Sequence, residues 1–254
     1  MSYKKGKHSR HIYDPTSYES YKLSRSKIWD FLDCPRCFYL EHRFGVARPQ
    51  GFQTDLKATV DLLLKKEFNM QRTNNTENPL MESYGLLGLV PFDHAKLNGW
   101  QEDHREVEYY DHGTNLIITG VVDDLWSDQG GNVIVVDYKA SSQEDSRNPD
   151  ARWKNGYKKQ METYQWLLRN NGLQVSDTGY FVYCKGRQDA EAFDGKLEFD
   201  IKIVPYTGDA SWVDQTLEDI KDCLDRNMSP SADPECDFCA YRKAAFDVLD
   251  VDEL

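Results

Sequence analysis

The clearest periodic pattern in the chain is an apolar stripe between residues 55 and 70. Leu56, Val60, Leu64 and Phe68 recur at four-residue intervals, with polar residues on the other sides. Residues four apart lie on one side of an α-helix, so this spacing predicts an amphipathic helix with one buried face. Further helices are predicted near residues 24–32, 38–40, 152–171 and 212–226.

The middle of the chain has a different pattern, typical of strands. Residues 105–110, 115–126 and 132–140 are rich in β-branched and aromatic side chains, and residues 127–131 between the last two contain two glycines. This arrangement predicts a β-hairpin. Two more strands are expected near residues 178–184 and 197–204. Helices, a meander, a helix and further strands together predict an α+β fold with a mixed central sheet flanked by helices.

Charge appears where two of these strands should be buried. Asp137 and Lys139 are two residues apart in the third segment, so they point to the same face. The preceding segment contains Gly120 and Asp123, and the hairpin would bring Asp123 close to Asp137. Two adjacent carboxylates repel, and a hard divalent cation relieves that repulsion. The alternative is that Asp137 and Lys139 form a structural salt bridge at the end of the strand and have no catalytic role.

A polar residue interrupts the apolar face of the next predicted helix. Tyr157, Gln160, Tyr164 and Leu167 follow helical spacing, so Gln160 lies on the face that should meet the sheet. Its amide either hydrogen-bonds to the backbone at the periphery or lies beside a metal or phosphate.

Composition limits the class of protein. A chain of 254 residues can bury one substantial core, and no apolar run is long enough for a membrane helix. We expect residues 1–22 to be a loosely held arm, residues 23–246 a single domain and residues 247–254 an acidic tail. The polar, basic N-terminus lacks the apolar stretch of a signal peptide, which places the protein in the cytoplasm. The net charge of -12 disfavours tight nucleic-acid binding, although Lys158 and its neighbours could form a local basic groove.

Four of the six cysteines form two closely spaced pairs. Cys34 and Cys37 lie near one end of the chain, and Cys236 and Cys239 lie near the other. In a reducing compartment this spacing is typical of metal ligands, and a shared metal would join the two terminal regions. Four thiolates suit either tetrahedral Zn²⁺ or an iron–sulfur cluster. Buried free thiols are the alternative.

The order of these motifs resembles the RecB-like branch of the PD-(D/E)XK nuclease superfamily. The matching segments are residues 120–123, 137–139 and 160–164. The resemblance implies an α/β/α restriction-endonuclease-like fold, with Mg²⁺ or Mn²⁺ held by Asp123, Asp137 and the main-chain carbonyl of Tyr138. It also implies catalytic roles for Lys139 and Gln160.

Further roles and one departure follow from the same resemblance. Tyr164 would contact the site or DNA, and Lys158 is our candidate DNA-binding lysine. Where RecB-like enzymes carry a metal-binding histidine on the early helix, this chain has Asp61, which we treat as a third carboxylate ligand. Relatives among the CRISPR-associated and AddB-like exonucleases hold a [4Fe–4S] cluster between terminal cysteines. Their usual cysteine distribution is one and three rather than two and two, so Zn²⁺ stays an alternative.

These observations predict a metal-dependent, exonuclease-like deoxyribonuclease acting in DNA repair, recombination or CRISPR adaptation. Its substrate would be single-stranded DNA or duplex ends. No helicase motif is present, so unwinding would require a helicase or CRISPR-adaptation partner. The alternative function is a non-catalytic subunit that retains the fold and binds nucleic acid or a protein partner.

Overall fold

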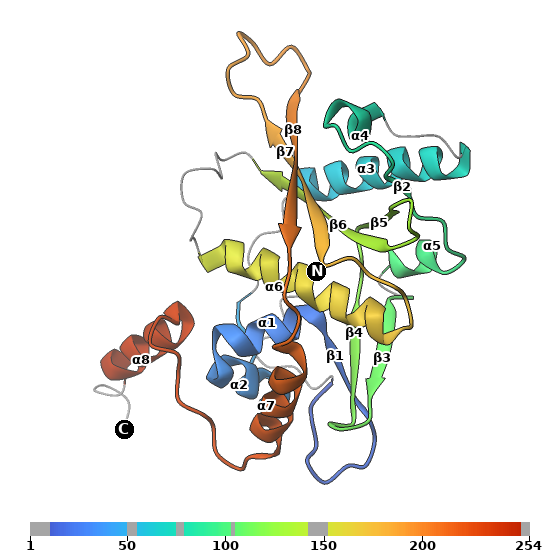
Figure 1. Cartoon of the computed structure of the whole chain (residues 1–254). Coiled ribbons are helices and arrows are strands. Elements are labelled where there is room, and N and C mark those ends of the chain that lie inside the picture. Colours follow the sequence, from blue (N-terminus) through green and yellow to red (C-terminus); the bar gives the residue numbers. More distant parts are fainter. Residues whose placement is uncertain (1–10, 50–54, 75–78, 103–104, 142–151, 250–254) are drawn as a thin grey trace. The chain divides into compact units, whose positions relative to one another are not determined.

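The computed structural model describes residues 11–49, 55–74, 79–102, 105–141 and 152–249 (Figure 1). The chain divides into two compact units. Unit 1 comprises residues 1–51, 110–118 and 212–254, and unit 2 comprises residues 52–109 and 119–211.

The core of unit 2 is a mixed five-stranded sheet in the order β2-β5-β6-β7-β8. Its strands are β2 (Val90–Pro91), β5 (Asp124–Ser127), β6 (Val133–Ser141), β7 (Thr178–Gly186) and β8 (Phe199–Thr207). β6 runs antiparallel to β5 and parallel to β7, while β7 and β8 are antiparallel. A parallel pair requires a crossover, which α6 (Arg152–Asn170) provides. The predicted α+β class with a mixed sheet is confirmed.

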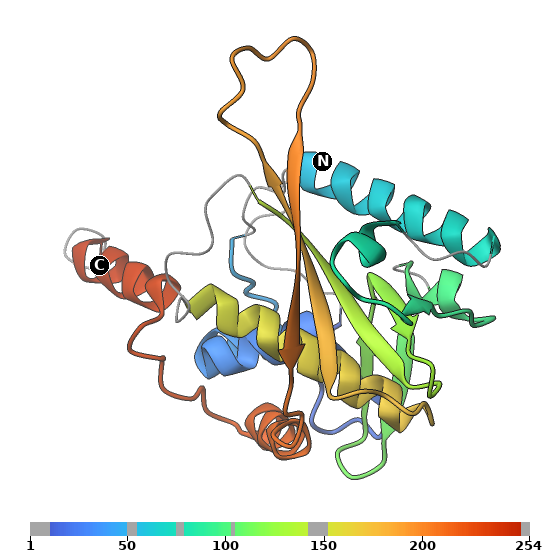
Figure 2. The ribbon, with the colours of Figure 1, turned by 45° about the horizontal axis from the view of Figure 1, so that its top comes forward.

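β6 is buried on both faces, and successive side chains along it point alternately into the apolar core and to the opposite face of the sheet. Ile134, Val136 and Tyr138 pack against the buried stripe of α3 (Asp55–Asn74). The intervening residues point to the opposite face, which α6 covers. The central sheet therefore lies between two helices, as expected for a three-layer arrangement (Figure 2).

Two expectations about these elements are wrong in detail. Residues 115–126 do not form one strand, because the chain leaves β4 (Leu116–Gly120) at Gly120 and resumes as β5 in the other sheet. Leu56 is 50% exposed, so the buried stripe of α3 consists of Val60, Leu64 and Phe68. The stripe loses its first member because Leu56 lies in the first turn of the helix, outside the cluster that packs on the sheet.

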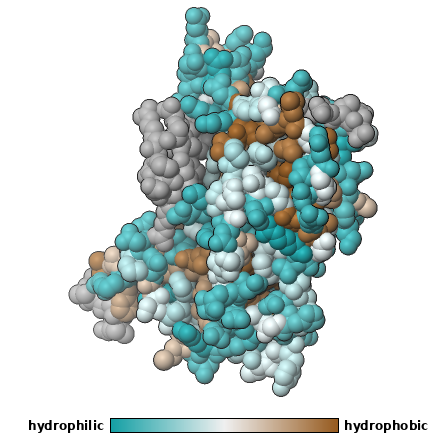
Figure 3. All heavy atoms as spheres, in the orientation of Figure 1, coloured by the Kyte–Doolittle hydropathy of each residue, from teal (hydrophilic) through white to brown (hydrophobic). Residues whose placement is uncertain are grey.

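Two short helices, α4 (Pro79–Ser83) and α5 (Leu97–Trp100), complete unit 2. Met81 of α4 joins the cluster formed by α3 and the sheet. Figure 3 shows a face that is mostly hydrophilic, with apolar side chains gathered over α3 and α4.

Unit 1 is built mainly from helices: α1 (Arg25–Asp33), α2 (Pro35–Phe44), α7 (Val213–Asp225) and α8 (Asp237–Leu249). Pro35 opens α2, where its missing N–H costs no hydrogen bond. Gly45 ends this helix with φ = 71°, a left-handed conformation that glycine adopts without strain. β1 (Tyr21–Ser24) belongs to a three-stranded sheet in the order β1-β4-β3, where β3 is Val107–Asp111.

The segment before β1 makes specific contacts within unit 1. The Tyr13 ring is buried, and its hydroxyl donates a 2.6 Å hydrogen bond to Asp225. The Tyr13 backbone N–H donates to the carbonyl of His42 at 2.7 Å. Residues 1–10 and 250–254, which include the basic end of the expected arm and part of the acidic tail, lie outside the described residues. Among the helices of the described residues, none is both long and apolar enough to cross a membrane.

Candidate active site and metal centre

Two acids meet in unit 2, as the hairpin pattern predicted. Asp123 follows β4, and Asp137 lies within β6 and is fully buried. The Oδ2 atom of Asp123 accepts a 2.9 Å hydrogen bond from the backbone N–H of Tyr138, which places the two carboxyl groups side by side. The carbonyl of Asp123 is held by the Gln101 amide at 2.7 Å, so both ends of the residue are positioned.

The Asp137 carboxyl is only partly satisfied. Its Oδ2 atom forms an ion pair with Lys139. Its Oδ1 atom is buried and accepts no hydrogen bond from the described residues. Burial raises the pKa of Asp137 to about 7; Lys139 opposes this rise and the adjacent Asp123 adds to it. A buried carboxylate oxygen without a donor, next to a second carboxylate, fits a site for a hard divalent cation.

Lys139 points into the same site from β6. Its side chain is 13% exposed, and its ammonium donates to Gln160 Oε1 at 3.2 Å. The ammonium also lies 4.5 Å from the centre of the Tyr157 ring, a cation–π contact. Burial opposes the charge on Lys139, but Asp137 and Asp123 outweigh it and raise its pKa. The amine therefore carries its proton throughout the neutral pH range.

Gln160 and Tyr164 of α6 support this lysine from the face opposite α3. Gln160 is 8% exposed, and its amide donates to the Tyr164 hydroxyl at 3.4 Å. The Tyr164 ring is 3% exposed and lies under Gly120, where a Cβ atom would come within 2.8 Å of Tyr164 Cε1. Gly120 therefore lets the end of β4 lie closer to the Tyr164 ring than a residue with a side chain could.

Asp61 lies on α3, and Lys65, a residue not predicted from the sequence, links it to Asp123. Lys65, one turn further along α3, has its ammonium 3.0 Å from Asp61 Oδ2 and 3.7 Å from Asp123 Oδ1. Burial and the nearby Asp123 raise the pKa of Asp61, while Lys65 lowers it. The four-residue spacing of Asp61 and Lys65 indicates in the sequence that the two side chains could pair. The same spacing is common in exposed ion pairs on helices, so it does not by itself point to a functional site.

A buried ion pair between Asp124 and Arg72, also not predicted from the sequence, contacts the strand that carries Asp137. Asp124 is fully buried and points away from Asp123, as neighbouring strand residues do. It pairs with Arg72 of α3 at 2.5 Å and accepts a 2.8 Å hydrogen bond from the Tyr138 hydroxyl. Burial raises the pKa of Asp124, and Arg72 opposes that rise. This network fixes the strand segment whose backbone N–H binds Asp123.

The four paired cysteines come together in unit 1. Their sulfur atoms all lie within 4.8 Å of one another. Cys37 Sγ is 3.6 Å from Cys236 Sγ and 3.5 Å from Cys239 Sγ, and Cys34 Sγ is 3.8 Å from Cys239 Sγ. Asp61, Asp123 and Asp137 do not gather as closely within the part of the chain described. The cysteine cluster fits a four-coordinate metal site.

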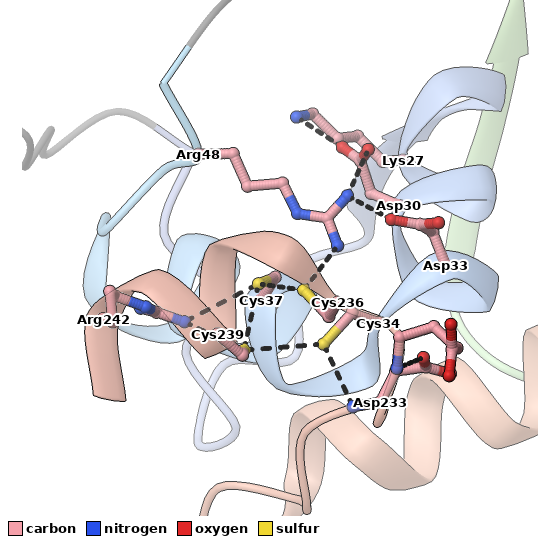
Figure 4. A network of polar contacts seen from close by, with 11 residues as sticks. Lys27, Asp30, Asp33, Cys34, Cys37, Arg48, Asp233, Cys236, Cys239 and Arg242 are labelled. Carbon is pink, nitrogen blue, oxygen red and sulfur yellow. Dashed lines mark hydrogen bonds and ion pairs between the residues drawn. The ribbon is translucent and has the colours of Figure 1, made fainter. Parts of the chain in front are cut away.

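Two arginines and a backbone amide surround these sulfurs (Figure 4). Arg242 donates to Cys239 at 3.4 Å and to Cys37 at 3.6 Å. Arg48 lies 3.9 Å from Cys236 and pairs with Asp33 at 2.7 Å. Burial alone would raise the pKa of Cys34, but backbone N–H groups, including that of Asp233, lower it to about 7. The surroundings therefore favour the thiolate, the form that binds metals, at Cys34. At Cys37 and Cys236 burial outweighs the neighbouring donors and raises the pKa of the thiol.

Lys158, the candidate DNA-binding lysine, lies on α6 one residue beyond Tyr157. It is half-buried, and its ammonium is 6.0 Å from the centre of the Tyr206 ring. Lys158 and Gln160 are two positions apart on the helix, so they do not share a face.

Comparisons with known proteins identify a family for this chain. The family model for the PD-(D/E)XK nuclease superfamily matches residues 80–244. Seven chains of known structure match. One of them, described as the crystal structure of SSO0001, is 16% identical, covers 90% of this chain and 84% of its own, and has a TM-score of 0.36. No curated protein matches.

The matched region spans the sheet, both acids, Lys139 and α6. The chain belongs to the PD-(D/E)XK nuclease superfamily.

Proposed function

We propose that the protein is a Mg²⁺- or Mn²⁺-dependent deoxyribonuclease of the RecB-like branch. One observation carries the proposal: Asp137 is fully buried beside Asp123, and one of its oxygens lacks a hydrogen-bond donor among the described residues. A buried, partly unsatisfied carboxylate is costly unless a cation binds it.

Asp123, Asp137 and the carbonyl of Tyr138 would hold the divalent ion. When bound, such an ion lowers the pKa of water and offsets the negative charge of a phosphodiester. Lys139 would supply a fixed positive charge at the reacting phosphate, because Asp137 and Gln160 hold its ammonium in place. Gln160 in turn is supported by Tyr164, which gives the tyrosine a positioning role in this proposal.

The biological substrate in this proposal is single-stranded DNA or duplex ends, processed in repair, recombination or CRISPR adaptation with a helicase or adaptation partner. The net charge of -12 favours the second candidate function, a non-catalytic subunit that binds nucleic acid or a protein partner. The two differ in whether DNA that binds is also cut.

Cleavage of end-labelled DNA separates the two functions. Purified protein is incubated with single-stranded DNA, blunt duplex and RNA of the same sequence, with Mg²⁺, Mn²⁺ or neither. Asp137→Asn and Lys139→Met should lose cleavage by at least about a hundredfold, while Lys66→Met, an exposed lysine of α3, should not. Binding without cleavage under either metal, or full activity in Asp137→Asn, would reject the proposal.

We further propose that the four cysteines bind a structural metal. The resemblance implies a [4Fe–4S] cluster, whereas the sulfur separations of 3.5, 3.6 and 3.8 Å favour a single tetrahedral ion such as Zn²⁺. Sulfurs about 2.3 Å from a tetrahedral zinc lie roughly 3.8 Å apart. A cluster places irons and sulfides between the thiolates and needs wider spacing.

Metal analysis and an absorption spectrum of anaerobically purified protein distinguish these metals. A colourless protein with one zinc per chain agrees with the sulfur spacing. A brown protein with a broad visible absorption that bleaches on reduction would instead show a cluster. Protein without either metal, in which the four thiols of the cluster all react with a thiol reagent, would reject the metal site.

A further inference from the structure

Lys65 lies where the proposed metal site would otherwise extend. Its ammonium is 3.0 Å from Asp61 and 3.7 Å from Asp123, and its side chain is 17% exposed. An ordinary ion pair between residues four apart on a helix lies in solvent and involves those two residues alone. Lys65 instead reaches across from α3 to the acid that follows β4.

The formal charges around the site indicate how many divalent cations it can hold. Three carboxylates, those of Asp61, Asp123 and Asp137, face two ammonium groups, those of Lys65 and Lys139. The formal sum is one negative charge. One divalent cation turns it into one positive charge, which a phosphodiester then balances. A second divalent cation would leave three positive charges in a half-buried site, and that accumulation is unfavourable.

The contacts of Lys65 also favour a single bound cation. Asp61 and Asp123 would be the carboxylates available to a second ion, and both contact Lys65. Lys65 contacts the Oδ1 atom of Asp123, whereas the Oδ2 atom of Asp123 accepts the hydrogen bond from the backbone N–H of Tyr138, the residue after Asp137. Asp137 offers an Oδ1 atom that is buried and without a hydrogen-bond donor in the described residues, and its ion pair is with Lys139 rather than Lys65. A cation can therefore enter beside Asp137 without displacing Lys65, whereas a cation between Asp61 and Asp123 cannot.

We propose that Lys65 is a positioning residue that takes the place of a second divalent ion, so that the centre binds one metal per chain. This inference rests on the proposed nuclease function. Asp61 then orients Lys65, and Lys65 orients Asp123 toward the single metal.

The test counts bound ions directly. Mn²⁺ is titrated into the protein, and free Mn²⁺ is measured by its electron paramagnetic resonance signal; this hard ion has little affinity for the thiolates of the cysteine cluster. The wild type should bind one Mn²⁺ per chain. Lys65→Met should bind a second, and its first ion should bind about tenfold tighter or more, since a nearby positive charge is removed. Lys65→Arg, which keeps the charge, should again bind one.

Lys66→Met on the exposed side of α3 is the matched control and should behave as the wild type. Circular dichroism and a thermal melt confirm that each variant is folded. Two ions in the wild type, or one ion with unchanged affinity in Lys65→Met, would overturn the inference while leaving the nuclease proposal intact. No Mn²⁺ binding by the wild type, or unchanged binding in Asp137→Asn, would overturn the nuclease site itself.

Discussion

Replacing Asp137 by asparagine should make the metal-free protein more stable, and increasingly so as pH rises. Burial raises the pKa of Asp137 to about 7 in the folded chain, against an ordinary value of 3.8. Between these values the folded carboxyl keeps a proton that the unfolded chain has lost. The unfolded state therefore binds fewer protons, and the stability of the wild type falls as pH rises through this window. Asparagine does not titrate and escapes this loss.

The size of the effect follows from the two pKa values. Each pKa unit corresponds to about 1.4 kcal/mol. Relative to the neutral amide, this difference in pKa lowers the stability of the wild type by about 4 kcal/mol at pH 8 and by about 2 kcal/mol at pH 5. The attraction of Lys139 is already contained in the value for Asp137, because that ion pair lowers it.

Urea unfolding at several pH values without added Mg²⁺ or Mn²⁺ measures this difference. Asp137→Asn should exceed the wild type at pH 8 by more than at pH 5, and added Mn²⁺ should stabilise the wild type alone. Asp222→Asn, at an exposed position of α7, is the control and should change little. A variant that is less stable than the wild type at pH 8, or a difference independent of pH, would refute the reasoning.

Three other substitutions test neighbouring parts of the structure. Gly120→Ala should cost about 1–3 kcal/mol in urea unfolding and reduce cleavage, because its Cβ would meet the Tyr164 ring at 2.8 Å. Cys239→Ser should remove the bound metal, as metal analysis would show, and lower the melting temperature. Arg72→Met should cost about 3–5 kcal/mol in urea unfolding, because it leaves the fully buried Asp124 without its partner.

Each of these variants has a matched comparison. Gly186→Ala adds a Cβ with no atom closer than 3.8 Å and should be tolerated. Cys223→Ser alters a buried cysteine outside the cluster and should keep the metal. The double variant Arg72→Met, Asp124→Asn removes both charges and should recover part of the lost stability. Metal loss in Cys223→Ser, or equal costs at Gly120 and Gly186, would contradict the assignments.

The parts of the site that were predictable are those encoded by short-range periodicity. The two-residue spacing of Asp137 and Lys139 within an apolar strand shows that they share a face, whatever surrounds them. The turn at residues 127–131 likewise determined the antiparallel pairing of β5 and β6. The fold class followed from the order of such elements.

The parts that were missed depend on long-range packing. The split of residues 115–126 between two sheets occurs at Gly120, which lies against the Tyr164 ring of α6, a contact across more than forty positions. Lys65 and Arg72 read as ordinary polar residues of an amphipathic helix. Only the docking of α3 on the sheet brings them to Asp123 and Asp124.

The cysteine cluster also bears on how the chain matures. Cys37 and Cys236 are separated by 199 residues, and the whole of unit 2 is translated between them. At about 5–20 residues per second, the first pair of thiols waits roughly 10–40 s on the ribosome for the second. A metal held by all four sulfurs, as proposed, would therefore be acquired only after the whole of unit 2 has been made.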